Sequence, residues 1–230
     1  MKKIVGIIGG MGPEATADFY MRLVKRTPAG SDQDHLHAII DGNAAIPDRT
    51  ESFLNHSTAT MDAVVESALQ LERMGAEILA MPCNSAHIWY DGIVAQITVP
   101  LINMVEEVFS EVREAGLQRV GLLGTSGTLQ SGLYERYAGD VNLLVPTDDE
   151  RERIHGALYE VKAGVRPDEG EGRGTLLDII TGYREKGAEG VILGCTEIPL
   201  LVSQNDLPGF PVFDSTGILV EATFRRAFAE

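Results

Sequence analysis

Residues 75–84 read GAEILAMPCN, and residues 187–196 read GAEGVILGCT. The two segments begin with the same three residues, and an offset of 112 superimposes Cys83 on Cys195, the two cysteines of the chain. In each segment an apolar run typical of a strand leads into a cysteine that is followed by polar residues. The match predicts that one structural unit occurs twice in this sequence.

Two further matches occur in the same order along the chain. Residues 3–9, KIVGIIG, match residues 119–124, RVGLLG, and residues 99–103, VPLIN, match residues 210–214, FPVFD. The offsets differ by a few residues, as expected when loops differ in length. Three ordered matches support an internal repeat of about half the chain.

Each half alternates short apolar runs with amphipathic segments, a pattern that indicates βαβ units around a parallel sheet. We predict first-half strands at 3–8, 36–41, 77–81 and 99–102 and helices at 13–26, 57–74 and 85–96. We predict second-half strands at 119–123, 141–145, 190–194 and 211–213 and helices at 103–115, 127–137, 147–163, 173–186 and 215–228, with a loop at 164–174.

The predicted fold is therefore α/β, with two pseudosymmetric lobes that each contain a parallel sheet flanked by helices. We expect residues 1–100 and 210–230 in the lobe of Cys83, and residues 101–209 in the lobe of Cys195. Each cysteine follows a strand, and ligands bind at the carboxyl ends of strands in open α/β sheets. An active site in a cleft between the lobes, with one cysteine on each wall, is the expected consequence.

The composition narrows the possible partners. The 230 residues carry a net charge of −15 and show no run of basic residues, which disfavours nucleic acids and anionic membranes. No stretch approaches the roughly 18 apolar residues of a membrane span, and glycines interrupt the apolar start too early for a signal peptide. We expect a cytoplasmic protein whose cysteines are free thiols.

Two thiols on opposite sides of one carbon suit racemisation. One sulfur removes a proton from one face, the other returns a proton to the opposite face, and the reverse reaction exchanges their roles. A free cysteine has a pKa near about 8.5, so a thiolate needs help near neutral pH. We expect the amino end of a helix after each cysteine to supply that help.

The residues around both cysteines resemble a known family. MPCNSAH at residues 81–87 and GCTEIPLL at 194–201 are similar to the paired cysteine motifs of the aspartate/glutamate racemases. GGMGP at 9–13 and PDRT at 47–50 resemble further motifs of the aspartate branch. The resemblance extends from residue 4 to about residue 214. It implies racemisation of aspartate, and possibly of glutamate, with no pyridoxal phosphate or other cofactor, and a homodimer.

The same resemblance implies roles for individual residues. Cys83 and Cys195 would be the two bases, and Arg49 and Lys162 would bind the carboxylates of the substrate, a task that suits the planar fork of arginine. The remaining expected substrate contacts are Met11, Gly12, Asn84, Ser85, Thr125, Thr196 and Glu197. The glutamate branch commonly has histidine where this chain has Glu197, which favours aspartate or a broad range of amino acids.

Several other interpretations stay open at this point. The glycines at 6–12 favour a small-anion site at the amino end of the following helix over a dinucleotide loop, because their spacing is not G-x-G-x-x-G. His35 and His37 have no third metal ligand nearby, so we expect no metal site, and His87 is expected to pack or hydrogen-bond near Cys83. A maleate-type cis–trans isomerase, in which one cysteine adds to the substrate, and a non-catalytic ligand-binding or redox-sensing relative are the functional alternatives.

Overall fold

Two lobes, each built on its own parallel sheet, make up the chain. The computed structural model describes residues 2–165 and 170–229. The first lobe runs to Met104 and takes up the chain again at Thr216, and the second lobe is Val105–Ser215. The chain therefore leaves the first lobe after residue 104 rather than 100, and returns to it after residue 215 rather than 209.

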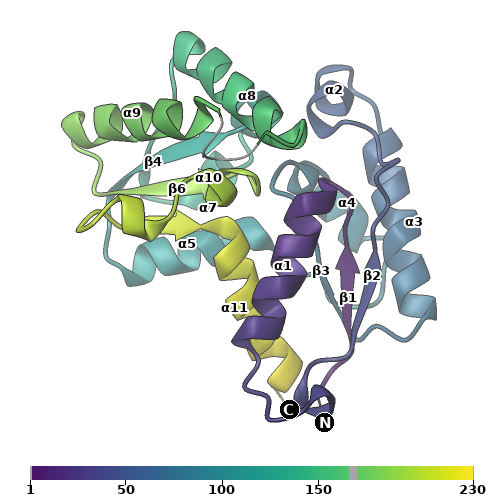
Figure 1. Ribbon diagram of the computed structural model, residues 1–230. Helices are drawn as coiled ribbons and strands as arrows, with labels where there is room; N and C mark the ends of the chain where they lie inside the picture. Colours follow the sequence, from purple (N-terminus) through teal and green to yellow (C-terminus); the bar gives the residue numbers. More distant parts are fainter. Residues whose placement is uncertain (1, 166–169, 230) are drawn as a thin grey trace. The chain divides into compact units, whose positions relative to one another are not determined.

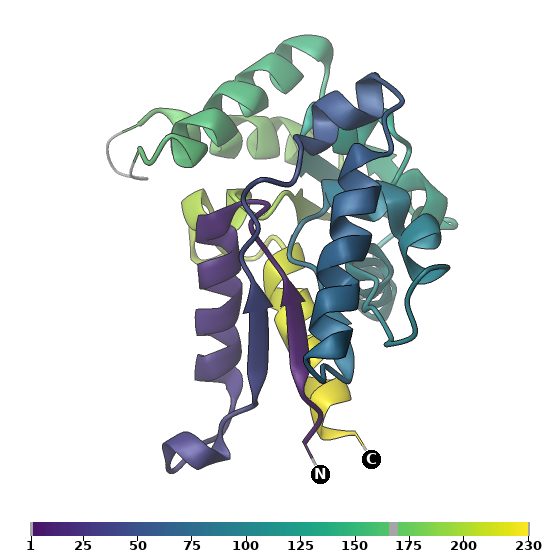
Figure 2. The same cartoon turned by 90° about the vertical axis from the view of Figure 1, so that its right-hand side faces the viewer.

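The first lobe contains a three-stranded sheet of order β2-β1-β3 with helices on both faces (Figure 1). Figure 2 shows α1 and α3 on opposite sides of β1 and β2. Successive residues of β1 alternate between the two faces: Ile7 packs with α1 and α11, and Ile8 packs with α3. The elements of this lobe are β1 (Val5–Ile8), α1 (Pro13–Arg26), η1 (Asp32–Asp34), β2 (Ala38–Asp41), α2 (Arg49–Leu54), α3 (Ala59–Arg73), β3 (Ile78–Ala80), η2 (Ser85–Trp89), α4 (Tyr90–Val94) and α11 (Ser215–Phe228).

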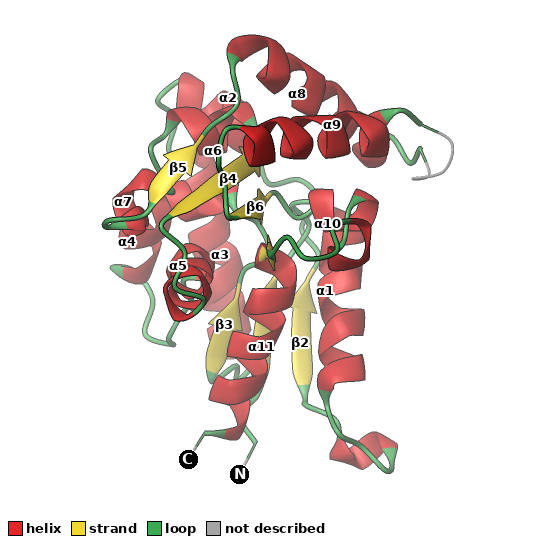
Figure 3. Ribbon diagram, turned by 90° about the vertical axis from the view of Figure 1, so that its left-hand side faces the viewer, coloured by secondary structure: helices red, strands yellow, loops and turns green. Residues whose placement is uncertain are grey.

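The second lobe contains a four-stranded parallel sheet of order β5-β4-β6-β7. Helices α8 and α9 lie side by side against this sheet (Figure 3), and their apolar residues form one core with those of β6. The elements are α5 (Met104–Glu114), β4 (Arg119–Gly124), α6 (Ser126–Gln130), α7 (Glu135–Ala138), β5 (Asn142–Leu144), α8 (Asp148–Lys162), α9 (Gly172–Glu185), β6 (Gly190–Gly194), α10 (Ile198–Leu201), η3 (Gln204–Asp206) and β7 (Val212–Asp214).

The internal repeat of the sequence corresponds to equivalent positions in the two sheets. β1 and β4 are central, β2 and β5 lie on one side of them, and β3 and β6, which lead to the cysteines, lie on the other. Even a carboxylate is repeated: Glu77 accepts a hydrogen bond from the backbone N–H of Ile4 at 2.8 Å, and Glu189 accepts those of Gln118 and Arg119 at 2.7 and 2.9 Å. Each carboxylate therefore binds the start of the central strand of its own lobe.

Residues 210–214 belong to the second lobe, contrary to the prediction, because β7 pairs with β6. The matching segment of the first lobe does not form the predicted strand at 99–102. Leu101 makes only an isolated bridge to Leu79, in which the N–H of Leu79 donates to Pro100 and the N–H of Ile102 donates to Leu79. Pro100 itself has no N–H to contribute, so pairing ends there.

Two predicted helices are broken. Residues 85–96 form a 3₁₀ turn and then α4, and residues 127–137 form α6 and α7, with Gly132 between them at a positive φ of 66°. The predicted loop at 164–174 is shorter at its end, since α9 begins at Gly172, and its residues 166–169 lie outside the described part of the chain. Helices α2 and α10 were not predicted.

Candidate active site

Cys83 lies at the carboxyl end of β3, in a buried turn of the first lobe. Its side chain is 3% exposed, and its Sγ lies 3.6 Å from the hydroxyl oxygen of Ser85. Asn84, which follows it directly, is also buried. The sulfur therefore has a neutral hydroxyl as its polar neighbour.

His87 holds the backbone of this turn in place. Its Nε2 accepts a hydrogen bond from the N–H of Met104 at 3.2 Å, so its Nδ1 carries the proton and donates to the carbonyl of Cys83 at 2.8 Å. Burial lowers the pKa of His87, which keeps the ring neutral. The expectation that His87 packs or hydrogen-bonds near Cys83 is confirmed.

The glycine-rich loop after β1 lies at the same end of the sheet, where the parallel strands have their carboxyl ends. The hydroxyl of Thr16 accepts from the N–H of Gly10 at 3.0 Å and donates to the carbonyl of Gly12 at 2.8 Å. Gly10 has a φ of +87°, and a Cβ there would lie 2.2 Å from the backbone of Asn43. The loop is therefore fixed by Thr16, a residue that the sequence analysis did not single out, although its place one turn after Gly12 is a usable signal.

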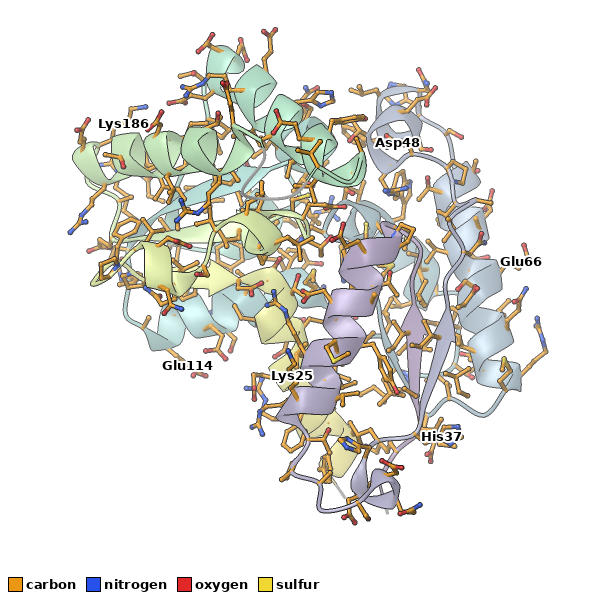
Figure 4. The ribbon with its side chains drawn as sticks, viewed as in Figure 1. Lys25, His37, Asp48, Glu66, Glu114 and Lys186 are labelled. Carbon is orange, nitrogen blue, oxygen red and sulfur yellow. The ribbon has the colours of Figure 1, made fainter. Side chains whose placement is uncertain are left out.

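Arg49 reaches this loop from α2. Its guanidinium donates to the carbonyl of Met11 at 3.5 Å and to that of Pro47 at 3.2 Å, while its Nε is buried without a hydrogen-bond partner. Asp48 caps α2 by accepting the N–H of Glu51 at 2.9 Å and is labelled beside that helix in Figure 4. The first lobe thus collects Met11, Gly12, Arg49, Cys83, Asn84 and Ser85 at one end of its sheet.

Cys195 follows β6 directly and has a different neighbour. Its side chain is 5% exposed, and its Sγ donates a hydrogen bond to Glu197 Oε2 at 2.9 Å. The hydroxyl of Thr196 donates to the same oxygen at 3.2 Å. Burial raises the pKa of Cys195 well above its usual value, the charge of Glu197 raises it further, and the charge of Lys162 lowers it.

The remaining second-lobe residues surround this sulfur. Gly124 and Gly194 are register partners in β4 and β6, so Thr125 and Cys195 leave the sheet side by side. Lys162, in the last turn of α8, is exposed, with its Nζ 5.1 Å from the ring centre of Tyr159. Tyr134, which the sequence analysis missed, is fully buried, and burial raises its pKa, which a thiolate at Cys195 would raise further.

A long helix does not start directly after either cysteine, contrary to the prediction, and the surroundings of Cys195 oppose its thiolate. Cys83 precedes a 3₁₀ turn rather than the continuous helix that residues 85–96 were expected to form, and the helix after Cys195, α10, has four residues. Side chains and burial therefore dominate the surroundings of both sulfurs. Within residues 2–165 and 170–229, no three His, Cys, Asp or Glu side chains are placed to hold a metal ion. None of the helices in these ranges is both long and apolar enough to cross a membrane.

Comparisons with known proteins agree on one family. The sequence model of Asp/Glu/hydantoin racemases matches residues 8–223. The broad specificity amino-acid racemase RacX of Bacillus subtilis is 26% identical over 227 residues, 96% of each chain. The aspartate racemase of Picrophilus torridus is 33% identical and superimposes with a TM-score of 0.87 over 98% of this chain and 94% of its own. An aspartate racemase homologue of Pyrococcus horikoshii is 30% identical, with a TM-score of 0.81 and complete coverage of both chains.

Proposed function

Because this chain belongs to the Asp/Glu/hydantoin racemase family, whose members work without pyridoxal phosphate, we propose that it interconverts L- and D-aspartate with Cys83 and Cys195 as its two acid–base groups. The observation that carries the proposal is the equivalent placement of the two cysteines. Each is buried at the carboxyl end of the strand that neighbours the central strand of its lobe. Racemisation requires such a pair, because the group that acts as base in the L-to-D reaction acts as acid in the D-to-L reaction.

The proposed reaction moves one proton at each face of the α-carbon. A thiolate takes the α-proton and becomes a thiol, leaving a carbanion stabilised by the adjacent carboxylate group. The opposite thiol gives its proton to the other face and becomes a thiolate. The mechanism requires each sulfur to approach the α-carbon to about 3–3.5 Å, and the reverse reaction exchanges the two roles.

Aspartate carries two carboxylates, and each lobe offers one cation for them. Arg49 has a buried Nε without a protein partner, so a planar carboxylate can satisfy it together with a second guanidinium N–H. Lys162 is exposed at the end of α8 near Cys195. The similarity to aspartate racemases favours aspartate, and the similarity to a broad specificity racemase extends the proposal to other amino acids.

The proposal also covers the setting in which the protein works. Both thiols must stay reduced for the reaction, so we place the enzyme in the cytoplasm. We further propose that it is a homodimer, which size-exclusion chromatography with light scattering tests directly.

The test is to follow purified protein with L-aspartate and with D-aspartate in the absence of any cofactor. We expect loss of optical activity from both directions. Cys83→Ala and Cys195→Ala should each lower the rate by at least about 10²–10⁴-fold, the usual contribution of a general acid or base. Far-UV circular dichroism of each variant checks that it is folded.

Two outcomes would contradict the proposal and favour another function. Conversion of maleate to fumarate without racemisation would favour the isomerase alternative. Binding of aspartate without any turnover would favour a ligand-binding relative.

A further inference from the structure

The carboxylate of Glu197 is turned toward the enzyme's own thiol. It is 5% exposed, and its Oε2 accepts hydrogen bonds from the Cys195 thiol at 2.9 Å and from the Thr196 hydroxyl at 3.2 Å. A residue that served only to contact substrate would have its oxygens open for the ligand. Here one oxygen is already occupied by two donors of the protein.

The short distance between sulfur and oxygen requires a proton between them. A thiolate and a carboxylate are both acceptors, so at 2.9 Å in a buried site they would repel each other without a hydrogen bond to compensate. The contact is favourable while the sulfur carries its proton and the carboxylate is charged. A carboxylic acid that donates to a thiolate would satisfy the same contact, but a carboxyl group ordinarily has a pKa near about 4.3 and a thiol near about 8.5, so the proton belongs on the sulfur.

The groups that face Cys195 from the described part of the lobe do not remove this preference. Burial and the side-chain carboxylate of Glu197 favour the thiol. The charge of Lys162 and a hydrogen bond from the backbone N–H of Glu197 favour the thiolate, and the buried phenol of Tyr134 adds no positive charge. Cys83 differs, because its polar neighbour is the neutral hydroxyl of Ser85 at 3.6 Å. The two sulfurs are thus equivalent in position and have unlike polar neighbours, a carboxylate at Cys195 and a hydroxyl at Cys83.

We propose that Glu197 is a positioning residue that keeps the proton on Cys195 Sγ in the substrate-free enzyme, so that Cys195 starts as the acid and Cys83 starts as the base. No atom is gained or lost in this assignment. It fixes which of two proton arrangements dominates before substrate binds. The assignment of acid and base roles rests on the two-thiol racemase proposed above, whereas the protonation of Cys195 is testable without any turnover.

The consequence for kinetics is specific. The equilibrium constant of racemisation is one, so kcat/KM is the same in both directions at every pH. If the dominant enzyme form has a Cys195 thiol, the alkaline limb of kcat/KM reports loss of that proton, and the acidic limb reports protonation of Cys83. Replacing the charge of Glu197 should therefore move only the alkaline limb.

The first experiment measures Cys195 directly in Cys83→Ala, in which it is the remaining thiol. The rate of alkylation by iodoacetamide is followed between about pH 6 and pH 11, and its midpoint gives the pH at which the thiolate forms. We expect a midpoint clearly above the ordinary thiol value of about 8.5. A midpoint at or below that value would overturn the proposal even if no Glu197 variant folds.

The second experiment adds Glu197→Gln, which keeps the shape and an acceptor oxygen but removes the charge. We expect the alkylation midpoint to fall by about one to three pH units, the usual effect of one close charge. In Glu197→Asp, which retains the charge, the alkylation midpoint should fall less. Glu185→Gln is the matched control, since it removes one charge from an exposed position at the end of α9 and should leave the midpoint unchanged.

The same substitutions in the two-cysteine enzyme test the catalytic consequence. Glu197→Gln should shift the alkaline limb of kcat/KM to lower pH by the same amount in both directions and leave the acidic limb in place. A raised KM with an unchanged alkylation midpoint would instead make Glu197 a simple substrate contact and overturn the proposal. If aspartate is not a substrate, the alkylation result still decides the role of Glu197, so the two proposals fail separately.

Discussion

At the residue scale, the two cysteines are aligned by sequence but have unlike surroundings. The sequence places Cys83 and Cys195 after equivalent strands, and both positions are buried in the structure. It does not predict that Glu197 turns toward Cys195 while Ser85 lies beside Cys83, because those contacts depend on side-chain rotamers. Glu197 stands where the glutamate branch commonly has histidine. Its contact with the sulfur of Cys195 means that this difference places a carboxylate beside the thiol.

His87 provides a prediction at the same scale. Burial lowers its pKa below the usual 6.5, so the unfolded chain takes up a proton before the folded protein does. The stability that neutral His87 supports is therefore complete above about pH 6.5 and decreases as the pH falls below it, by up to about 1.4 kcal/mol per pH unit. His87→Gln should remove this part of the pH dependence and cost about 1–3 kcal/mol at neutral pH through its imperfect hydrogen bonds.

Urea unfolding of both proteins between about pH 5 and pH 8 checks the prediction. The control is His37→Gln, since His37 is exposed, and it should retain the wild-type slope. Equal slopes in His87→Gln and the wild type would show that His87 does not titrate differently on folding.

At the element scale, the strands were predicted better than the short helices. Short continuous runs of apolar residues identify the parallel strands, because these strands are buried on both faces. The breaks at residues 85–96 and 127–137 follow from local geometry, such as the positive φ of Gly132, which hydrophobic periodicity does not report. Helix α2 lies in a segment for which we predicted no helix, and its start depends on the cap supplied by Asp48.

The packing of α9 on β4 gives a prediction for one pair of glycines. A Cβ at Gly121 would lie 2.2 Å from the ring of Tyr183, which is fully buried and donates to the carbonyl of Leu122 at 3.1 Å. Gly121→Ala should therefore destabilise the protein by about 1–3 kcal/mol or more. Gly182, the neighbour of Tyr183 in α9, has open space around its Cβ position, and Gly182→Ala should stabilise by about 0.5–1 kcal/mol.

Denaturant unfolding of the two variants compares the same substitution at adjacent places in one lobe. A loss of stability in Gly182→Ala, or none in Gly121→Ala, would contradict the packing described for Tyr183. Because neither position belongs to the candidate site, any loss of activity in these variants should follow the loss of folded protein.

At the scale of the whole molecule, the internal repeat explains why one chain holds two equivalent sulfurs. The three sequence matches correspond to the central strand, the cysteine strand and the segment next to it in each lobe. The repeat predicted the order of elements, but it did not predict where the chain crosses between lobes. Those crossings are decided by pairings such as β6 with β7, which composition alone does not distinguish.

The most direct test of the two-thiol account is hydrogen exchange at the α-carbon. L-aspartate and D-aspartate are each incubated in deuterated water with wild-type protein, Cys83→Ala or Cys195→Ala, and α-deuterium and optical activity are measured together. The account predicts that the wild type incorporates deuterium as it inverts the substrate, and that each single variant loses inversion while any remaining exchange is confined to one enantiomer. Inversion by either variant at the wild-type rate, or inversion without deuterium, would contradict it.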